Sequence, residues 1–275
     1  MAKGLFVGLA GMDIIYYSDN YPNRNDKSAI DDYKTFTGGP AANEAITFSM
    51  LGGDSTLITN IEESPIGDVI KANLESYSVR VIDLSKGIDI LPFISAIMVD
   101  SNGERSIWSG QRKFPESDFT LEDCDFDFCM CDCYMYPHSM KILRDLPDSV
   151  QICLDVDAYG DHVYDYLQLA DMAILSSKVW SSIDQGLLKP DLKIAITDND
   201  CPIRILDSET TYSVPVEKVE AIDTLGAGDI FHGAFAYYFY DQGRTLEDSI
   251  REASGIATLS VKYHGTREWY DHARP

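Results

Sequence analysis

The sequence predicts an α/β protein of three layers, in which helices flank a mostly parallel central sheet and a small second sheet is added. Two observations predict this fold class. Short apolar runs alternate with helix-like segments for much of the chain, and two β-prone stretches interrupt that alternation. The length of 275 residues suffices for one large hydrophobic core. We therefore expect a single domain spanning residues 1–275.

The alternating elements can be placed in order along the chain. Buried strands are predicted at residues 5–9, 55–61, 126–134, Gln151–Val156, 172–175 and Lys193–Thr197. Helices are predicted at Pro40–Leu51, 66–76, 229–241 and 245–263. The first helix opens with a proline after two glycines and closes near a second glycine pair, which are common start and stop signals. Buried strands separated by helices imply parallel pairing.

The two interrupting stretches are residues 14–36 and 88–110, and neither shows a helical period. Within the second, two β-prone runs flank the turn-forming sequence DSNG at residues 100–103, which predicts a hairpin. We expect the two stretches together to form the small second sheet.

The formal net charge of −23 limits which partners can bind. An acidic surface repels phosphate backbones and anionic membrane leaflets, so we expect no nucleic-acid partner and no membrane partner. No apolar run reaches the roughly 18 residues that a membrane-spanning helix needs. The apolar N-terminal segment runs into Asp13 without a convincing signal-peptide cleavage site, and we interpret it as the first buried strand.

Three of the six cysteines, Cys129, Cys131 and Cys133, alternate along one predicted strand and would share one of its faces. A metal site is one alternative, but this spacing lacks the CxxC geometry of common zinc sites. We interpret the cysteines as small buried residues in a reduced compartment, and we therefore expect a cytoplasmic protein. The five histidines show no metal-binding spacing, and we interpret them as surface or packed residues.

The most specific chemical signal is the string DTLGAGD at residues 223–229, directly before an apolar helix. Gly226 and Gly228 remove side chains where the backbone must approach a ligand closely. Consecutive N–H groups at the start of a helix form an anion cradle. Asp229 would lie beside that cradle, where a carboxylate can accept the proton of an attacking hydroxyl. The alternative is a glycine-rich turn with an ordinary first-turn acid.

The longer string DTLGAGDIFHGAF, which starts at Asp223, resembles the C-terminal signature of the ribokinase-like, or PfkB, carbohydrate kinases. Other landmarks follow in the family's order. GLAGMD at residues 8–13 resembles the end of the family's first strand, and GGPAAN at 38–43 resembles its Gly-Gly substrate turn. PIGD at 65–68 resembles the family's next glycine turn, and GER at 103–105 resembles its lid hairpin. The resemblance covers essentially the whole chain. It implies the ribokinase-like fold, which cradles phosphate without the GxxxxGK[ST] loop that this sequence lacks.

The resemblance also implies an activity and a set of site residues. The implied reaction transfers the γ-phosphoryl group of ATP to a hydroxyl of a small sugar, with Asp229 as the catalytic base and the amides of Gly226, Ala227 and Gly228 as the anion hole. The implied substrate-binding residues are Asp13, Gly38, Gly39, Asn43, Arg105 and Asp132. The implied nucleotide-binding residues are Thr197, Asn199, Thr224, Gly226, Gly228, Ala257 and Ser260.

Further implications concern ions, assembly and two open assignments. The family uses Mg²⁺, K⁺ is a second candidate ion, and the lid, formed here by residues 14–36 and 88–110, often mediates homodimers. Asp132 could instead be a solvated acid at a strand end, and Arg105 an exposed turn residue.

The sequence departs from the family pattern at three places. The family's NxxE motif, which organises the Mg²⁺ water shell, is replaced by Ser176 and Val179 at its two defining positions, so the sequence names no metal ligand. The nucleotide turn TxGxxG reads TDNDCP from Thr197, without either glycine. Pro40 stands where many sugar kinases place Lys or Asn.

Several functional hypotheses remain at this stage. The segments ESYSVRV and FISAIMVDSNGERSI look most like the ketohexokinase and ribokinase branches, which favours a ketose or a pentose as substrate. A nucleoside kinase of the same fold is one alternative, and a non-catalytic binding member, suggested by the lost motifs, is another. A dinucleotide-dependent oxidoreductase is disfavoured because residues 8–11 give GxxG and not GxGxxG.

Overall fold

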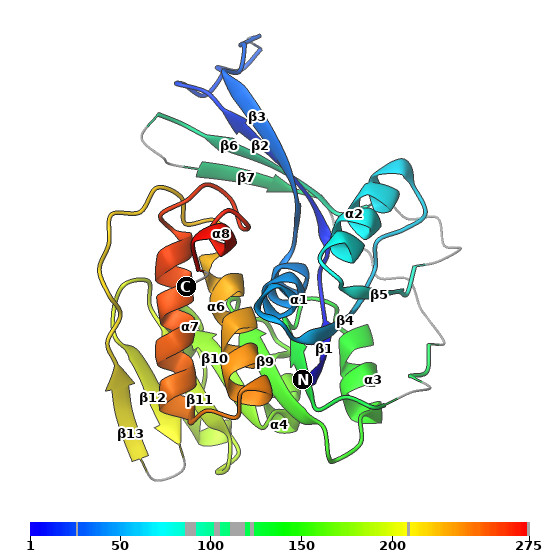
Figure 1. Ribbon diagram of the computed structural model, residues 1–275, viewed down its shortest axis with the longest axis vertical. Helices are drawn as coiled ribbons and strands as arrows, with labels where there is room; N and C mark the ends of the chain where they lie inside the picture. The colour runs from blue at the N-terminus through cyan, green and yellow to red at the C-terminus, as the bar shows by residue number, and fades with distance from the viewer. Residues whose placement is uncertain are drawn as a thin grey trace.

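The computed structural model describes residues 1–25, 27–85, 92–101, 105–110, 119–121, 124–207 and 210–273. Its strands form two sheets, a large one in the body of the molecule and a small one that projects from one end (Figure 1). In the described part of the chain, no helix is both long enough and apolar enough to cross a membrane.

Nine of the described strands form the large sheet. In spatial order they are β13 (Thr210–Val214), β12 (Ile203–Asp207), β11 (Lys193–Thr197), β10 (Met172–Ser176), β9 (Gln151–Val156), β8 (Phe128–Cys131), β1 (Lys3–Val7), β4 (Asp54–Thr59) and β5 (Arg80–Asp83). Pairing is parallel from β11 to β5, whereas β12 and β13 are antiparallel to their neighbours at one edge. This arrangement confirms the predicted mostly parallel sheet.

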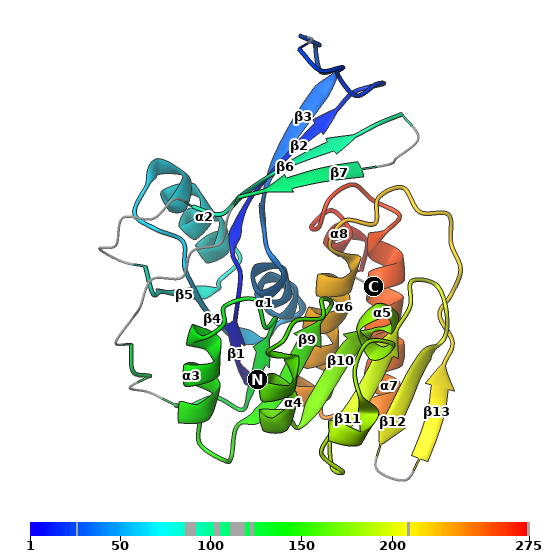
Figure 2. The same cartoon turned by 180° about the vertical axis from the view of Figure 1, so that it is seen from behind.

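Helices cover both faces of this sheet (Figures 1 and 2). One face is covered by α1 (Pro40–Leu51), α2 (Pro65–Ser76), α6 (Ala227–Ala236) and α7 (Leu246–Ser260), and the other by α3 (His138–Asp145), α4 (Val163–Leu169) and α5 (Ser177–Trp180). Phe48, Phe235 and Ile250 belong to the apolar core on the first face, and Leu143 and Leu167 to the core on the second. Burial on both faces explains why the central strands are continuous apolar runs.

The second sheet contains β2 (Gly11–Tyr17), β3 (Asp32–Gly38), β6 (Ile94–Val99) and β7 (Arg105–Ser109), in the order β3-β2-β6-β7. Strands β6 and β7 pair antiparallel as a hairpin, and β2 pairs parallel with β6. All four strands come from the two β-prone stretches of the sequence or their immediate flanks. The hairpin turn at 102–104 and residues 86–91 lie outside the described residues.

Two short connections, residues 8–10 and Gly39, join the second sheet to the body of the molecule. Strand β2 follows β1 after residues 8–10, and β3 leads into α1 through Gly39. Gly39 has a φ of +97°, and a Cβ at this position would lie 2.5 Å from the carbonyl oxygen of Leu9. Glycine is therefore required at this junction by both backbone conformation and space.

Several elements differ from the sequence prediction. The predicted helix 229–241 begins at Ala227 and continues past Ala236 as a π-helical turn, η2 (Tyr237–Asp241). Cys133 lies beyond the end of β8 with a φ of +60°, so only Cys129 and Cys131 share a strand face. All six cysteines are free. The short elements β5, β12, β13, α3, α4, α5, η1 (Gln185–Leu187) and α8 (Tyr270–Ala273) were not predicted.

Candidate functional site

The predicted site residues gather where the parallel strands end and two helices begin. Strands β1, β8 and β9 end beside the N-termini of α1 and α6. Crevices at the carboxyl ends of parallel strands are the usual ligand sites of open α/β sheets. The first turn of α1 carries Asn43, and the first turn of α6 carries Asp229.

A chain of hydrogen bonds fixes the carboxylate of Asp229. The Nδ2 amide of Asn43 donates to Oδ2 of Asp229 at 2.6 Å. The Oδ1 atom of Asn43 accepts from Nη2 of Arg267 at 2.8 Å, and Nη2 also donates to the carbonyl oxygen of Thr37 at 3.2 Å. Because a guanidinium has only donors, the amide oxygen of Asn43 must face Arg267 and its NH₂ group must face Asp229.

The electrostatic environment of Asp229 suits a general base. Burial raises the pKa of Asp229 to about 7, the hydrogen bond from Asn43 opposes that rise, and the nearby carboxylate of Asp155 adds to it. A base whose pKa lies near the working pH is both available in its deprotonated form and strong enough to accept a proton.

The two glycines at the start of α6, Gly226 and Gly228, differ in conformation and in the space around them. Gly226 precedes the helix with a φ of +68°, and a Cβ there would lie 2.4 Å from Cγ2 of Thr266. Gly228 is exposed, and a Cβ there would meet no heavy atom within 4 Å. Gly226 is therefore needed to form the turn, whereas Gly228 leaves open space at the N-terminus of a helix, where an anion is favoured. These features fit the phosphates of a nucleotide.

The carboxylate of Asp223 holds this turn in place. It accepts from the amide of Leu225 at 2.8 Å and from the amide of Gly265 at 2.9 Å. The second bond ties the turn to the C-terminal segment that carries Arg267. Thr224, a predicted nucleotide contact, is exposed within the same turn.

Asp13 and the Gly38-Gly39 turn lie on the other side of the site. Strand pairing places Gly38 opposite Gly11, and a Cβ on Gly38 would lie 1.9 Å from Oδ2 of Asp13. Burial raises the pKa of Asp13, although the hydroxyl of Ser95 and the charge of Arg267 act in the opposite direction. Since Arg267 also bonds Asn43, the structure brings Asp13, Gly38, Gly39, Asn43 and Asp229 together.

Asp132 is engaged by the backbone around it. Its carboxylate is buried and accepts from the amides of Leu9 at 2.7 Å, Ala41 at 3.4 Å and Tyr134 at 3.0 Å. A Cβ on Gly8 would lie 2.2 Å from the same carboxyl group. These bonds identify Asp132 as an anchor of the turns beside the site, and they rule out the alternative of a solvated strand-end acid. A direct contact with substrate stays a prediction.

Arg105 begins β7 in the second sheet, and its backbone pairs opposite Val99. Its side chain lies outside the described residues, so its contact with substrate also stays a prediction.

Of the two predicted nucleotide residues at the end of β11, Thr197 is half-buried and Asn199 is exposed. Thr197 ends β11, and its hydroxyl donates to the carbonyl oxygen of Leu175 at 3.4 Å. Asn199 follows with a φ of +48°. The nearby carboxylate of Asp200 pairs with Nζ of Lys218 at 2.9 Å, so one of the two acids in this turn has a basic partner.

The two predicted nucleotide residues on α7 differ in how accessible they are to a ligand. Ser260 is buried, and its hydroxyl donates to the carbonyl oxygen of Ala257 at 2.8 Å within the helix. That hydroxyl is therefore already bonded, whereas Ala257 is only partly buried.

The residues at the family's Mg²⁺-organising positions do not fit that role. The Oγ atom of Ser176 accepts from the amide of Val179 at 3.3 Å and caps α5, and Val179 is fully buried. Neither side chain supplies a carboxylate, so we assign no catalytic step to Mg²⁺.

Sequence reasoning missed four residues of this region. Arg267 comes from a C-terminal segment without a periodic pattern, and Glu44, Asp155 and His232 form a buried cluster behind the site. One signal was available for the cluster, because His232 follows Asp229 by three positions and so lies on the same face of α6.

A family model for pfkB family carbohydrate kinases matches residues 1–125 and 192–273 of this chain. The chain belongs to this family. The family resemblance that the motifs predicted is thereby confirmed, and with it the enzyme class, a phosphotransferase with an alcohol group as acceptor.

Curated proteins of similar sequence include members with different substrates in their names. A ribokinase of Dictyostelium discoideum is 23% identical, covering 96% of each chain. A deoxyribokinase of Salmonella typhi is 24% identical, covering 96% of this chain and 94% of the relative. A nucleoside kinase of Methanothermobacter thermautotrophicus is 24% identical, covering 96% of this chain and 90% of the relative. Membership therefore establishes a sugar or nucleoside kinase of the pfkB family.

Solved structures confirm the ribokinase-like fold. Ribokinase from Cryptococcus neoformans, in complex with ADP, superposes with a TM-score of 0.80 at 16% identity, covering 98% of this chain and 96% of that chain. Ribokinase from Arabidopsis thaliana, complexed with ribose and ATP, gives a TM-score of 0.79 at 18% identity, covering 96% of this chain and 94% of that chain.

Proposed function

We propose that this pfkB-family protein is an ATP-dependent kinase that phosphorylates a hydroxyl of a small sugar, with a ketose or a pentose favoured. One observation carries the proposal. The Asp229 carboxylate lies in the first turn of α6, directly after the open glycine cradle, and is held by Asn43 of the substrate-side turn. A base, a site for hydroxyl groups and an anion cradle therefore meet at one point.

The reaction follows from this convergence. The carboxylate of Asp13 and the amide of Asn43 hold hydroxyl groups of the sugar, and Asp229 takes the proton of the attacking hydroxyl. The new bond forms between that oxygen and the γ-phosphorus of ATP, and the bond from the γ-phosphorus to the β-phosphate oxygen breaks to release ADP. The amides of Gly226, Ala227 and Gly228 stabilise the negative charge on the transferring group.

The second sheet is proposed to form a lid over the bound substrate. We assign residues 14–36 and 88–110 to a lid that closes over the bound sugar within a single domain. Closure would exclude water, which otherwise competes with the sugar as phosphoryl acceptor. The homodimer through this lid stays a prediction, and exposed Tyr33, Ile107 and Trp108 on its two edge strands would supply the apolar surface.

The substrate class rests on similarity and on the hydroxyl-binding residues. The relatives include a ribokinase and a deoxyribokinase, and one similar structure contains ribose with ATP. The pairing of Asp13 with a glycine turn leaves a carboxylate beside open backbone, which suits an acceptor that presents several hydroxyl groups.

A nucleoside is the second candidate acceptor, and one feature favours it. A cavity of about 480 Å³ lies between the second sheet and residues 221–225. Ile15, Ile97, Val99 and Leu225 form an apolar part of its wall, and its polar part includes Asp100, Ser101, Asp223, Thr224 and His264. Ile15 shares a strand face with Asp13, so apolar surface continues from the hydroxyl-binding carboxylate. An apolar wall of this kind would suit the base of a nucleoside, and the relatives include a nucleoside kinase.

The test is ADP release with a panel of ketoses, aldopentoses, deoxypentoses and nucleosides, in buffers with Mg²⁺ and with either K⁺ or Na⁺. We expect turnover with at least one acceptor and a loss of about 10³-fold or more in kcat for Asp229→Asn, which keeps the shape of the side chain but cannot accept the proton. The control is Asp145→Asn, an exposed acid on α3.

The proposal fails if no acceptor raises ADP release above ATP hydrolysis alone, or if Asp229→Asn matches the wild type. Sugar binding without turnover would instead identify a non-catalytic member. Greater turnover with nucleosides than with free sugars would select the second candidate.

A further inference from the structure

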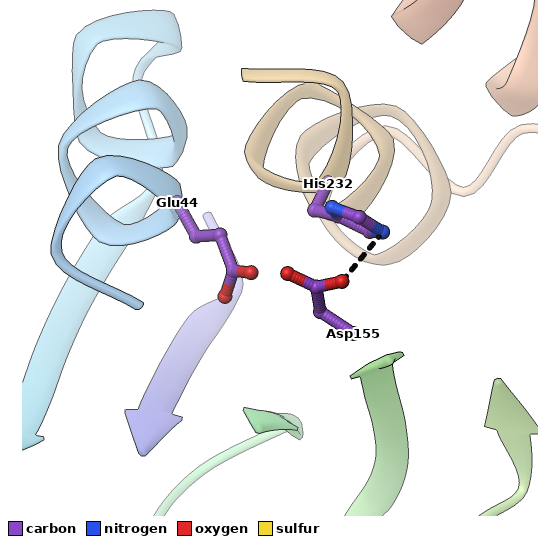
Figure 3. Close-up of side chains that lie close together, drawn as sticks. All are labelled: Glu44, Asp155 and His232. Carbon is purple, nitrogen blue, oxygen red and sulfur yellow. Dashed lines mark ion pairs between the residues drawn. The ribbon is translucent and has the colours of Figure 1, made fainter. Parts of the chain in front are cut away.

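Three side chains that the proposed reaction does not use meet behind the site. Glu44 comes from α1, Asp155 from the end of β9 and His232 from α6, and they point toward one another (Figure 3). Their exposed fractions are 0%, 5% and 6%. Two acids and an imidazole are thus enclosed together in the interior.

These groups have few hydrogen-bond partners for their depth of burial. Within the described residues, the carboxyl group of Glu44 can bond that of Asp155 only if one of the two is protonated, and its oxygens have no other partner. The ring of His232 lies beside the backbone of Gly228, but neither of its nitrogens makes a well-aligned hydrogen bond. Nε2 of His232 lies 3.4 Å from Oδ1 of Asp155. A buried polar group without a partner costs free energy, and a buried unpaired charge costs more.

Further acids surround the cluster. The carboxylates of Asp132 and Asp229 lie near Glu44, in addition to that of Asp155. Arg267 is the nearby cation, but its guanidinium is bonded to Asn43 and to the carbonyl oxygens of Thr37 and Thr266. Within the described residues, no lysine or arginine side chain is bonded to Glu44, Asp155 or His232.

The donor atoms of the three side chains lie close to one another. One donor from each side chain can be chosen so that all lie within 4.8 Å of one another. Ligands about 2.1 Å from a tetrahedral ion are about 3.4 Å apart, which matches the separation of Nε2 and Oδ1.

We propose that Glu44, Asp155 and His232 bind one divalent transition-metal ion. An imidazole nitrogen with two carboxylates suits Zn²⁺ or Mn²⁺, whereas Mg²⁺ prefers oxygen ligands and water. Three protein ligands leave a further position for water. The ion would join α1, β9 and α6, and so would fix the helix that carries Asp229 against the helix that carries Asn43.

The first measurement is metal content. Metal-free protein is dialysed against Zn²⁺ or Mn²⁺ in an excess of Mg²⁺, which keeps Mg²⁺-type sites filled, and its metals are counted by mass spectrometry. We expect about one equivalent for the wild type, and a loss of at least tenfold in affinity for Glu44→Gln. The control is Glu62→Gln, a buried glutamate outside the cluster, which should bind as the wild type does.

The second measurement is thermal unfolding, which does not depend on activity. Because the ion binds only the folded protein, Zn²⁺ at a hundredfold excess over its Kd should raise the Tm of the wild type and of Glu62→Gln by about 5 °C or more. For Glu44→Gln the rise should be no more than about half as large, because a site weakened tenfold or more is then at no more than about ten times its Kd.

A third measurement on the wild type alone covers the case in which Glu44→Gln does not fold. X-ray absorption at the zinc edge should show one imidazole with oxygen ligands at about 2.0–2.2 Å and no sulfur. The proposal is overturned by metal content below a tenth of an equivalent, by equal binding and Tm shifts in Glu44→Gln, or by sulfur ligation. The first of these outcomes would mean that Glu44 and Asp155 share a proton instead.

Discussion

Arg267 orients the amide of Asn43, and through it the carboxylate of Asp229. The bond from Nη2 to Oδ1 of Asn43 leaves the amide NH₂ as the only group that can face Asp229. Replacing Arg267 with Met keeps a similar length but removes the donors, so the amide can turn over. We expect kcat/KM to fall by about 10- to 100-fold, the scale of a misplaced reacting group.

The measurement is steady-state kinetics with the best acceptor, with Arg251→Met as the control. Arg251 is an exposed residue of α7 that pairs with Glu247 one turn away, and its loss should leave kcat/KM unchanged. Equal rates for Arg267→Met and the wild type would show that Asn43 keeps its orientation by other means.

The pH dependence of the reaction should report Asp229. Its pKa is raised to about 7, so below that pH the carboxyl is protonated and cannot act as a base. The value of kcat/KM should therefore increase about tenfold per pH unit below pH 7 and level off above about pH 8. The hydrogen bond from Asn43 stabilises the charged carboxylate of Asp229 and lowers its pKa. In Asn43→Ala this bond is absent, so the midpoint of the profile should move to higher pH.

The profile is measured as kcat/KM from pH 5 to 9 with an acceptor that does not ionise in that range. A profile that is flat from pH 5 to 8, or a midpoint that moves to lower pH in Asn43→Ala, would contradict the assignment of Asp229.

The site could be predicted from the sequence where function depends on contiguous residues. The string DTLGAGD places Asp229, Gly226 and Gly228 correctly relative to one another because all lie within one turn and the start of one helix. Arg267 and Asp155 enter the region only through tertiary folding. No local pattern marks them, since each is an ordinary charged residue until the chain brings it beside the site.

At the level of secondary-structure elements, the turn before α6 permits a paired test. Gly226→Ala forces a side chain into a positive-φ position and against Thr266, whereas Gly228→Ala places a methyl group in open space. We expect Gly226→Ala to lower both the Tm and kcat. We expect Gly228→Ala to keep the Tm within about 2 °C, because surface changes usually cost less than about 0.5 kcal/mol, while kcat falls because the methyl group fills the anion cradle.

Thermal unfolding gives the Tm of both glycine variants, and steady-state kinetics gives their kcat. A Gly228→Ala enzyme with full kcat would show that the transferring group does not approach this amide, and the anion hole would have to be sought elsewhere.

Long elements with strong patterns were predictable, and short edge elements were not. Helix α1 and strands β9 and β11 have the predicted bounds, because caps and apolar runs define them locally. Strands β12 and β13 are half exposed at an antiparallel edge, where few buried residues mark them. The π-helical turn η2 continues the apolar pattern of α6 without a residue that signals the change.

For the whole molecule, the net charge of −23 predicts how salt affects stability. Self-repulsion among excess acids disfavours the compact state, and added ions screen it. We expect the Tm to increase as NaCl is raised from low ionic strength to about 0.5 M, where the Debye length falls below about 5 Å. Tetramethylammonium chloride should act equally if screening is the cause, whereas a larger effect of KCl would reveal a specific K⁺ site.

The unfolding is followed by circular dichroism at constant pH. A Tm that does not change or that falls over this range would mean that the acids are already paired or hydrated well enough for repulsion to be negligible.

Gly8 and Gly38 each lie against a carboxyl group, which limits the residues that can replace them in related sequences. A side chain at residue 8 would overlap the carboxyl of Asp132, and one at residue 38 would overlap the carboxyl of Asp13. A larger residue at either position therefore requires the acid beside it to move, to be shortened or to be lost. Each pair couples two positions, and among related sequences a larger residue at position 8 or 38 should be accompanied by a change at the matching acid.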